Sequence, residues 1–484
     1  METLTRRLLA VLCLAALCLT GCGAASYAGT ATPETAAATP ETAVPALAGP
    51  LTPLRQDDGQ VFYSIVPAGL SRGEGVVCRL DASGVQTPLC PWSHCGHDGT
   101  QFPAWLADRY VYLLFVLDGA PHLFYRGADQ ADWEARQEWN REMIDGLGGG
   151  GDYDQAAAAQ DAREQLYRQP PRLERLDPVT GVRDWLCEFP DLDDDQAMRL
   201  HYGLRGDLYT DGQALYGSYY TSGENCARLM RLGLDGSVSV RPLPRAESST
   251  VYAMAGSCVL YLHIRSPVDL RSLELAGNTN LVNQLSNSVS YDYRLWDLAT
   301  GEDRLLYTES AWQGTQSPLT FEWMTPRRAY WNRIIFDGEA ADRRSTGLDF
   351  VVMDLTGDQM EQTTWTRGAD QYTYECVNFG TRDDGTDIYA ALRVMSPVSG
   401  EVWVFDAATG QALTTFALPG TLGEGACPRA LLEGEWVVCG SWVDDTVITA
   451  LLPLESLLNG DTRTWALPVT GWQPDPVLAE APSG

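Results

Sequence analysis

Cysteine and histidine side chains are concentrated in one short stretch, Cys90–Asp98, which reads CPWSHCGHD. Zinc ligands in proteins usually come in two pairs of Cys or His, with roughly two to four residues between the members of a pair. Here His94 and Cys95 are adjacent, so they would point to opposite sides of a strand, and no second cluster follows. The stretch favours a small disulfide loop, and we predict no metal site.

Two acidic stretches offer the oxygen ligands that calcium prefers. Asp191, Asp193 and Asp195 alternate as at the start of a calcium loop, but the glycine turn and the distal glutamate of an EF-hand are missing. The stretch Thr381–Asp387, TRDDGTD, is equally typical of a hairpin turn. Neither pattern by itself predicts a bound cation.

The search for catalytic motifs in the sequence does not identify a reaction. The chain has no His-Glu-x-x-His pair, and the glycine run Gly148–Gly151 follows no predicted strand, so it reads as a hinge and not as a phosphate-binding loop. We therefore predict no cofactor. Paired carboxylates for glycoside hydrolysis are defined in space and not by spacing. With 64 Asp and Glu residues in the chain, that possibility stays open.

The cysteine count bears on disulfides. Of twelve cysteines, three lie in the first 22 residues, and the nine that follow cannot all pair within one chain. Cys427 and Cys439 lie about symmetrically around Glu433 and Gly434, so a hairpin there would bring them nearly opposite each other. We predict a disulfide between these two cysteines.

The elements that position these residues are repeated hairpins. Glu401–Gly420 reads EVWVFDAATGQALTTFALPG, in which an apolar strand enters Asp-x-x-Thr-Gly and a second strand leaves the turn. Aspartate can accept hydrogen bonds from nearby backbone N–H groups, and glycine supplies a positive φ. Related stretches are Arg79–Cys90, Arg172–Pro190, Leu229–Pro244, Tyr293–Tyr307, Val351–Trp365 and, more loosely, Ala450–Pro468.

A second strand pair precedes most of these hairpins, as in Val251–Ile264 and Leu431–Trp442. Two hairpins in roughly 50 to 60 residues form the four-stranded blade of a β-propeller. The sequence thus predicts an all-β, seven-bladed β-propeller over residues 54–478, with a small helical insertion at 127–171 and a tail at 479–484. The first blade has one strand, Gln60–Val66, before its hairpin, so we expect Val469–Leu478 to supply its innermost strand.

The helical insertion and the other long connections suggest a binding face. If the Asp-x-x-Thr-Gly hairpins join the third and fourth strands of each blade, the long connections share the opposite face, because successive strands alternate in direction. Insertions gathered on one face of a repeat protein commonly mark its binding face. The predicted binding residues are Trp92, His94, His97, Trp133, Trp139 and Arg271.

The N-terminus has the features of an exported protein. Arg6 and Arg7 precede the apolar run LLAVLCLAALCL, and residues 1–21 read as a signal peptide that ends before Cys22. Residues 22–53 are rich in Ala, Thr, Pro and Glu and poor in large apolar residues, so we predict a disordered tether.

These features together resemble a known family. The motif Leu19-Thr20-Gly21-Cys22 resembles the lipobox of bacterial lipoproteins, and Leu89, Cys90, Cys95 and His97 match an L-C-x-x-x-x-C-x-H signature. With the tether and the hairpins, they resemble extracytoplasmic β-propeller lipoproteins of Clostridia-type bacteria, which are similar to DUF5050 and TolB-like propellers. Phe102-Pro103 stands where that family has Cys-Pro. The resemblance implies a propeller held outside the cell membrane by a lipid on Cys22.

Charge and fold together narrow the function. The formal net charge is −30, and all 34 basic residues are Arg, so the chain would repel nucleic acid. We expect a binding or scaffold protein for a glycan or an envelope protein. The alternative is a glycoside hydrolase or polysaccharide lyase acting at the channel mouth, with the 15 Trp and 21 Tyr as candidate sugar-stacking residues.

The lipid anchor can be tested directly. If Cys22 carries the lipid, metabolic labelling with a fatty-acid probe marks the protein, and Cys22→Ala abolishes the label and releases the protein from the membrane. Labelling that survives this substitution would contradict the assignment.

Overall fold

A computed structural model describes the chain from residue 46 to residue 470, with gaps. The gaps are 69–72, 93–101, 128–133, 191, 193–207, 222–225, 267–287, 311–315, 338–343, 357–361, 368–371, 382–387, 396–399, 407–410, 418–425, 442–446 and 462–468, together with 135–137, 139, 143 and 149.

The described strands form seven sheets, in each of which consecutive strands are antiparallel neighbours. The first sheet contains β2 (Val61–Pro67), β3 (Gly75–Asp81) and β4 (Val85–Pro88), with β5 (Trp105–Leu106) and β29 (Val469–Thr470) added to it. The second contains β6 (Tyr112–Leu117), β7 (Ala120–Tyr125), β8 (Arg172–Leu176) and β9 (Arg183–Glu188). The third contains β1 (Thr52–Pro53), β10 (Tyr209–Thr210), β11 (Ala214–Thr221), β12 (Cys226–Gly233) and β13 (Val238–Glu247).

The remaining four sheets follow in chain order. The fourth contains β14 (Ser249–Ala255), β15 (Cys258–Arg265), β16 (Ser290–Asp297) and β17 (Asp303–Ser310). The fifth contains β18 (Thr320–Met324), β19 (Arg328–Asp337), β20 (Arg344–Asp354) and β21 (Gln362–Arg367). The sixth contains β22 (Tyr372–Thr381), β23 (Ile388–Met395), β24 (Gly400–Asp406) and β25 (Gln411–Ala417). The seventh contains β26 (Ala426–Leu432), β27 (Trp436–Ser441) and β28 (Val447–Pro453).

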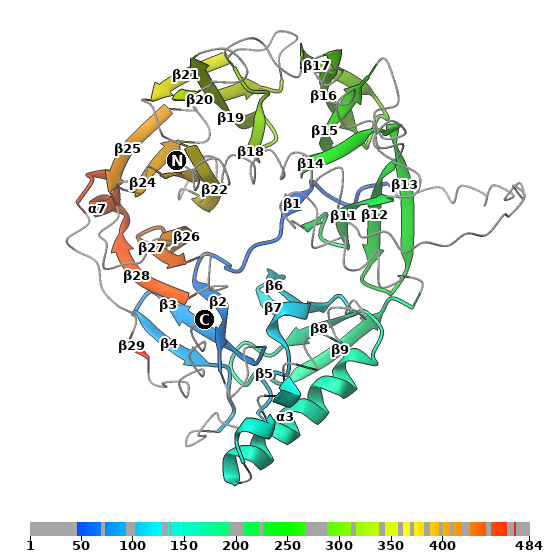
Figure 1. Cartoon of the computed structure of the whole chain (residues 1–484), viewed down its shortest axis with the longest axis vertical. Coiled ribbons are helices and arrows are strands. Elements are labelled where there is room, and N and C mark those ends of the chain that lie inside the picture. Colours follow the sequence, from blue (N-terminus) through cyan, green and yellow to red (C-terminus); the bar gives the residue numbers. More distant parts are fainter. Residues whose placement is uncertain are drawn as a thin grey trace, which may run out of the picture. The chain divides into compact units, whose positions relative to one another are not determined.

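The sheets are arranged as the blades of a β-propeller (Figure 1). Contacts run from β14 to β18, β18 to β22, β22 to β26, β26 to β2 and β2 to β6, so the last sheet meets the first. The second and third sheets share a core that includes Phe124 and Met230. The predicted all-β propeller is confirmed. Six sheets have four or more strands and the described part of the seventh has three, because residues 462–468, where we expected its fourth strand, lie outside the described residues.

An N-terminal strap, residues 46–58, runs along the inner strands (Figure 1). Leu51 exchanges two backbone hydrogen bonds with Gly256, β1 pairs with β10, and the carbonyl of Arg55 accepts from the N–H of Val116 at 2.7 Å. The strap therefore touches the fourth, third and second sheets before it enters β2. We had assigned residues up to 53 to the tether, but strand pairing begins earlier because Leu51 is apolar and only 1% exposed.

The C-terminal return to the first sheet differs from the prediction. Val469 and Thr470 pair in parallel with Val85 and Gln86 of β4, at the outer edge of the sheet. The strap reaches the inner edge instead, where Asp57 forms an antiparallel bridge with Phe62. The N-terminal approach to β2 thus occupies the place that we had given to the C-terminal segment.

The Asp-x-x-Thr-Gly turns join the third and fourth strands, as predicted; for example, Asp177–Gly181 joins β8 and β9. The carboxylate of Asp177 accepts hydrogen bonds from the backbone N–H groups of Thr180 and Val179, at 2.7 and 3.0 Å, and from the Thr180 hydroxyl. The Thr180 N–H first, and then these other bonds, hold the pKa of Asp177 below its ordinary value. Local sequence alone specifies this turn.

The glycines of two such turns form a matched test. Gly181 and Gly301 both have positive φ, +67° and +79°, but a Cβ at Gly181 would lie 2.5 Å from the carbonyl oxygen of Leu89, whereas a Cβ at Gly301 would meet nothing within 4 Å. We expect Gly301→Ala to cost about 1 kcal/mol and Gly181→Ala to cost clearly more, as measured by chemical denaturation. Equal losses would contradict the close packing of this turn against the preceding sheet.

Candidate binding face

The strand order divides the connections between two sides of the ring. In each four-stranded antiparallel sheet, the first-to-second and third-to-fourth connections lie on one side, which we call the turn face. The second-to-third connections and the links between sheets lie on the other side, which we call the insertion face. It receives the long connections at residues 89–111, 126–171, 189–208 and 266–289. The strand order thus agrees with the predicted side for the described ends of these connections.

The helical insertion is docked on the insertion face. Helix α3 (Gly151–Tyr167) buries Ala156, Ala159 and Leu166. The guanidinium of its Arg163, only 2% exposed, donates to the carbonyl of Ala107 at 2.9 Å. Both a buried polar contact and apolar burial therefore hold this helix, which is drawn in Figure 1.

Further contacts join α3 to the sheets beneath it. The hydroxyl of Tyr167 donates to Asp108 at 2.6 Å, and the hydroxyl of Tyr125 in β7 donates to the carbonyl of Leu166 at 2.9 Å. The helix is thus bound both to the link between the first and second sheets and to β7. Helix α3 lies within the predicted helical insertion, residues 127–171, and the described residues among 134–146 are helical as well.

The structure describes only one of the predicted binding residues. Trp92 follows β4 on the link to the next sheet, is 52% exposed, and donates its backbone N–H to the sulfur of Cys90 at 3.4 Å. His94, His97, Trp133, Trp139 and Arg271 lie outside the described residues. The acidic run Asp191–Asp195 is also outside them, except for Leu192.

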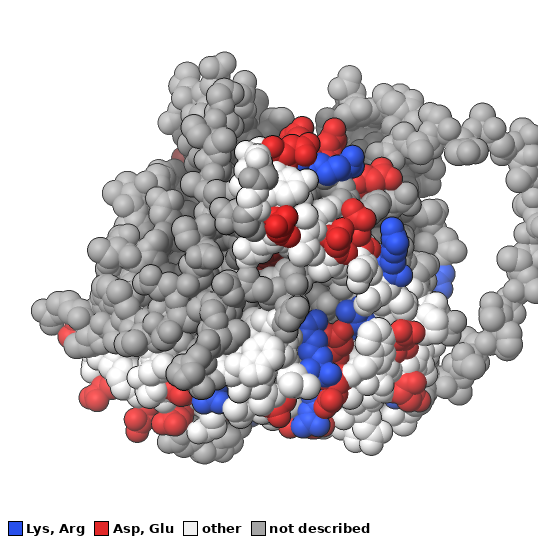
Figure 2. All heavy atoms as spheres, turned by 90° about the horizontal axis from the view of Figure 1, so that it is seen from below, with Lys and Arg blue, Asp and Glu red and all other residues white. Residues whose placement is uncertain are grey.

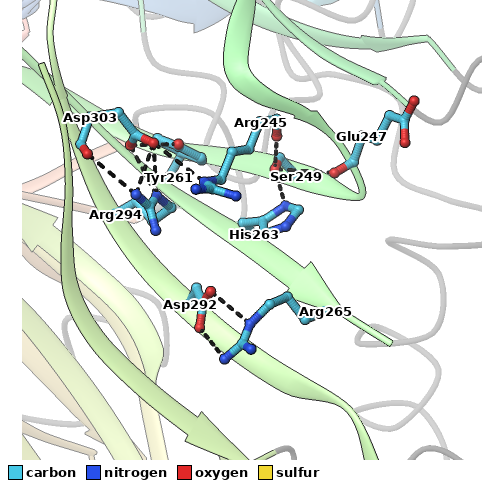
Figure 3. Close-up of polar contacts among 9 residues, drawn as sticks. All are labelled: Arg245, Glu247, Ser249, Tyr261, His263, Arg265, Asp292, Arg294 and Asp303. Carbon is cyan, nitrogen blue, oxygen red and sulfur yellow. Dashed lines mark hydrogen bonds and ion pairs between the residues drawn. The ribbon is translucent and has the colours of Figure 1, made fainter. Parts of the chain in front are cut away.

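A polar cluster that we did not predict lies on the fourth sheet (Figure 3). Asp292 of β16 accepts two hydrogen bonds from Arg265, the last residue of β15, at 2.8 and 2.9 Å, and one from Thr308 of β17 at 2.7 Å. Although burial opposes it, hydrogen bonds from Thr308 and Arg265 hold the pKa of Asp292 below its ordinary value. The connection 266–289 begins directly after Arg265, so this cluster fixes its base.

The neighbouring Ser249 and His263 form a contact that resembles a nucleophile and a base. The hydroxyl of Ser249 lies 3.1 Å from Nδ1 of His263. However, Ser249 is only 1% exposed, and its hydroxyl donates to the carbonyl of Arg245. Nδ1 of His263 is then the donor to Ser249, so the pair does not generate a nucleophile in the manner of a serine hydrolase.

A second carboxylate organises the outer part of the cluster. Asp303 accepts from the hydroxyl of Tyr261 at 2.7 Å and from Nε of Arg294 at 3.0 Å, and it lies 3.4 Å from Nε of Arg245. Burial and the charge of Asp303 raise the pKa of Tyr261, which therefore stays protonated as a donor. Five separate strands contribute to the whole cluster.

No motif in the sequence marks this cluster. Its members lie in β13 to β17, and antiparallel register brings them together, for example by placing His263 opposite Asp292. The only available signal is the alternation of Tyr261, His263 and Arg265 along one strand, which places these side chains on one side of the sheet. The sequence predicts long connections between strands but not the polar cluster at the base of connection 266–289.

The remaining motifs are placed by the topology. The letters Gly-x-Ser-x-Gly occur at Gly69–Gly73, between β2 and β3, whereas a nucleophile elbow requires a helix after the turn.

The register pairs Cys427 with Gly440 and Cys439 with Pro428, so these cysteines are one position out of line, and their disulfide stays a prediction. Within the described ranges, no group of three or more His, Cys, Asp or Glu could hold a metal ion.

The charged surface is mixed in the view of Figure 2, where acidic and basic side chains are interspersed among the described residues. Within the described part of the chain, no helix is long and apolar enough to cross a membrane.

Comparisons with known proteins find similarity to solved structures alone. No family model matches the chain, and no curated protein matches it. Among solved structures it is similar to an oligogalacturonate lyase in complex with manganese (15% identity, TM-score 0.33, covering 62% of this chain and 71% of the other). It is also similar to TolB from Acinetobacter baumannii (10% identity, TM-score 0.30, covering 73% and 62%).

A third similar structure is a puromycin-hydrolyzing peptidase from Mycobacterium tuberculosis, with 13% identity and a TM-score of 0.38. The match covers 84% of this chain and 52% of the peptidase, so the chain spans about half of that protein. None of these similarities assigns an activity to the chain.

The partly buried imidazole of His263 should make the protein less stable in acid. Burial, followed by the charge of Arg245, lowers the pKa of His263, so below about pH 6.5 the unfolded chain binds more protons and stability falls as pH falls. We expect the melting temperature to drop between pH 7.5 and 5, and to drop less in His263→Gln. Identical pH profiles for parent and variant would contradict the burial of this imidazole.

Proposed function

We propose that this protein is an extracytoplasmic binding or scaffold protein, anchored to the outer face of the cell membrane by a lipid on Cys22. Its partner is a glycan or an envelope protein, held by the insertion face. The observation that supports this proposal is the gathering of the long connections on one side of the ring. Binding residues commonly lie on loops that a rigid scaffold positions.

The scaffold beneath that face is well fixed. The strap ties three sheets together through Leu51, β1 and Arg55. Helix α3 is held by Arg163 and Tyr167 against a different part of the ring. A rigid base lowers the entropy lost when the loops bind a partner.

We also propose that the ring has seven complete blades. The seventh sheet ends with β28 and the short helix α7 (Leu454–Leu458), and residues 462–468 precede β29. The sequence TRTWALP at Thr462–Pro468 has the β-branched and aromatic residues of a strand. It would supply the outer strand of the last blade before β29 reaches β4.

A glycoside hydrolase or polysaccharide lyase would need free carboxylates at the channel mouth. At the inner edge of the first sheet, the carboxylate of Asp57 is engaged by Arg55, whose Nε lies 3.0 Å away. The Asp57 side chain is only 5% exposed. Asp57 is therefore not a free carboxylate, and an assay for glycan cleavage distinguishes binding from hydrolysis.

The two tryptophans with nearly equal exposure provide the test. Trp92 on the insertion face is 52% exposed, and Trp185 on the outer strand β9 is 51% exposed. A glycan array and a pull-down from the parent cell envelope are run with the parent chain, Trp92→Ala and Trp185→Ala. We expect Trp92→Ala to weaken capture about tenfold, as for a central aromatic contact, and Trp185→Ala to bind as the parent does.

Replacing residues 127–171 with a short Gly-Ser linker extends this test to the whole insertion. The linker variant should keep the strand content by circular dichroism and lose partner capture. Full capture by both the linker variant and Trp92→Ala would refute the insertion face as the binding face. Release of shortened glycans by the parent would support the hydrolase or lyase instead.

A further inference from the structure

The arginines of the polar cluster on the fourth sheet have more N–H donors than the carboxylates of the cluster accept. Arg265 directs Nε and one terminal nitrogen to Asp292, and Arg245 directs Nε to Asp303. Their side chains are 54% and 50% exposed. Because a guanidinium has five N–H donors, each arginine keeps donors that face solvent.

These two arginines lie on either side of His263 (Figure 3). The guanidinium of Arg245 comes from the end of β13 in the third sheet, whereas Arg265 comes from β15 in the fourth. The imidazole lies between them, with Ser249 behind it. Guanidinium donors from both sheets therefore flank the imidazole of His263.

The charges of the cluster leave a defined excess. Arg245, Arg265 and Arg294 bring three positive charges, and Asp292 and Asp303 bring two negative charges. The carboxylate of Glu247 points away from the cluster in Figure 3. Among these five described side chains one positive charge is left over, in a chain whose net charge is −30.

We propose that this cluster binds a single carboxylate group of a sugar acid, held between Arg245 and Arg265. The guanidinium fork matches the planar carboxylate, to which it donates two parallel hydrogen bonds. One excess charge suits a singly charged carboxylate better than a doubly charged sulfate or phosphate. The site lies at the base of connection 266–289, on the proposed binding face, and its ligand class is therefore a sugar acid. Only the biological role of this site rests on the proposed function.

A carboxylate bound at this place should change the pKa of His263, which can be followed by NMR spectroscopy. His263 faces Arg245 from β13, Ser249 from β14, and Asp292 and Arg294 from β16. An added negative charge beside the imidazole favours its protonated form. Binding should therefore raise the pKa of His263, which a role confined to fold stability would not do.

The experiment is a titration of the purified full chain, carrying 13C-labelled histidine, with galacturonate and, as its neutral match, galactose. The signal of His263 is assigned by His263→Gln. We expect galacturonate to shift this signal saturably and to raise its pKa, and galactose to leave it unchanged. The absence of a saturable shift with galacturonate, or an equal response to galactose, would overturn the proposal.

Variants locate the carboxylate. Arg245→Gln leaves Asp303 with Arg294 and Tyr261, so we expect an intact fold and about tenfold weaker binding. Arg265→Lys keeps the charge and loses the fork, and should also weaken binding. Arg79→Gln removes another partly exposed arginine, paired with Asp81 at 3.8 Å in the first sheet, and should bind as the parent does. Parent-like binding by Arg245→Gln and Arg265→Lys would overturn the site, whatever the Trp92 and linker variants show about the binding face.

Discussion

Antiparallel pairing of consecutive strands is the constraint on which the rest of this structure depends. The backbone N–H and C=O groups between neighbouring strands of a blade pair with each other, and the short turns allow this only if the chain reverses at every strand. Reversal then fixes which connections share a side. The helical insertion at 126–171 and the connection 266–289 lie on one face for this reason, although they belong to different sheets.

The ring is closed by both ends of the described chain. Through Leu51, β1, Arg55 and Asp57, the N-terminal strap contacts the inner strands of successive sheets. In the described part of the C-terminal segment, β29 meets the outer edge of β4 with two residue pairs. Among the described residues, the strap therefore contributes more strand pairing to the closure than β29 does.

The chain has no lysine, and the ion pairs seen among the described residues are made by guanidinium groups, including in the interior. Arg333 contacts the buried carboxylate of Glu309, and Glu174 receives both Arg172 and Arg183. A guanidinium can satisfy a carboxylate with two parallel bonds and still donate to another group. The same property leaves donors in reserve at Arg245 and Arg265, where two sheets meet at the insertion face.

Local sequence determined the elements of this protein, and the tertiary structure decided what those elements bring together. Asp177 and Gly181 specify their turn because their hydrogen bonds and positive φ need only neighbouring residues, so the hairpins, the propeller and the helix α3 could be predicted. The inner edge of the first sheet could not be predicted, because the strap competes for it through pairing partners far along the chain. The cluster around His263 also escaped prediction, because its residues come from five strands, and register between those strands, not spacing along any one of them, places the charges side by side.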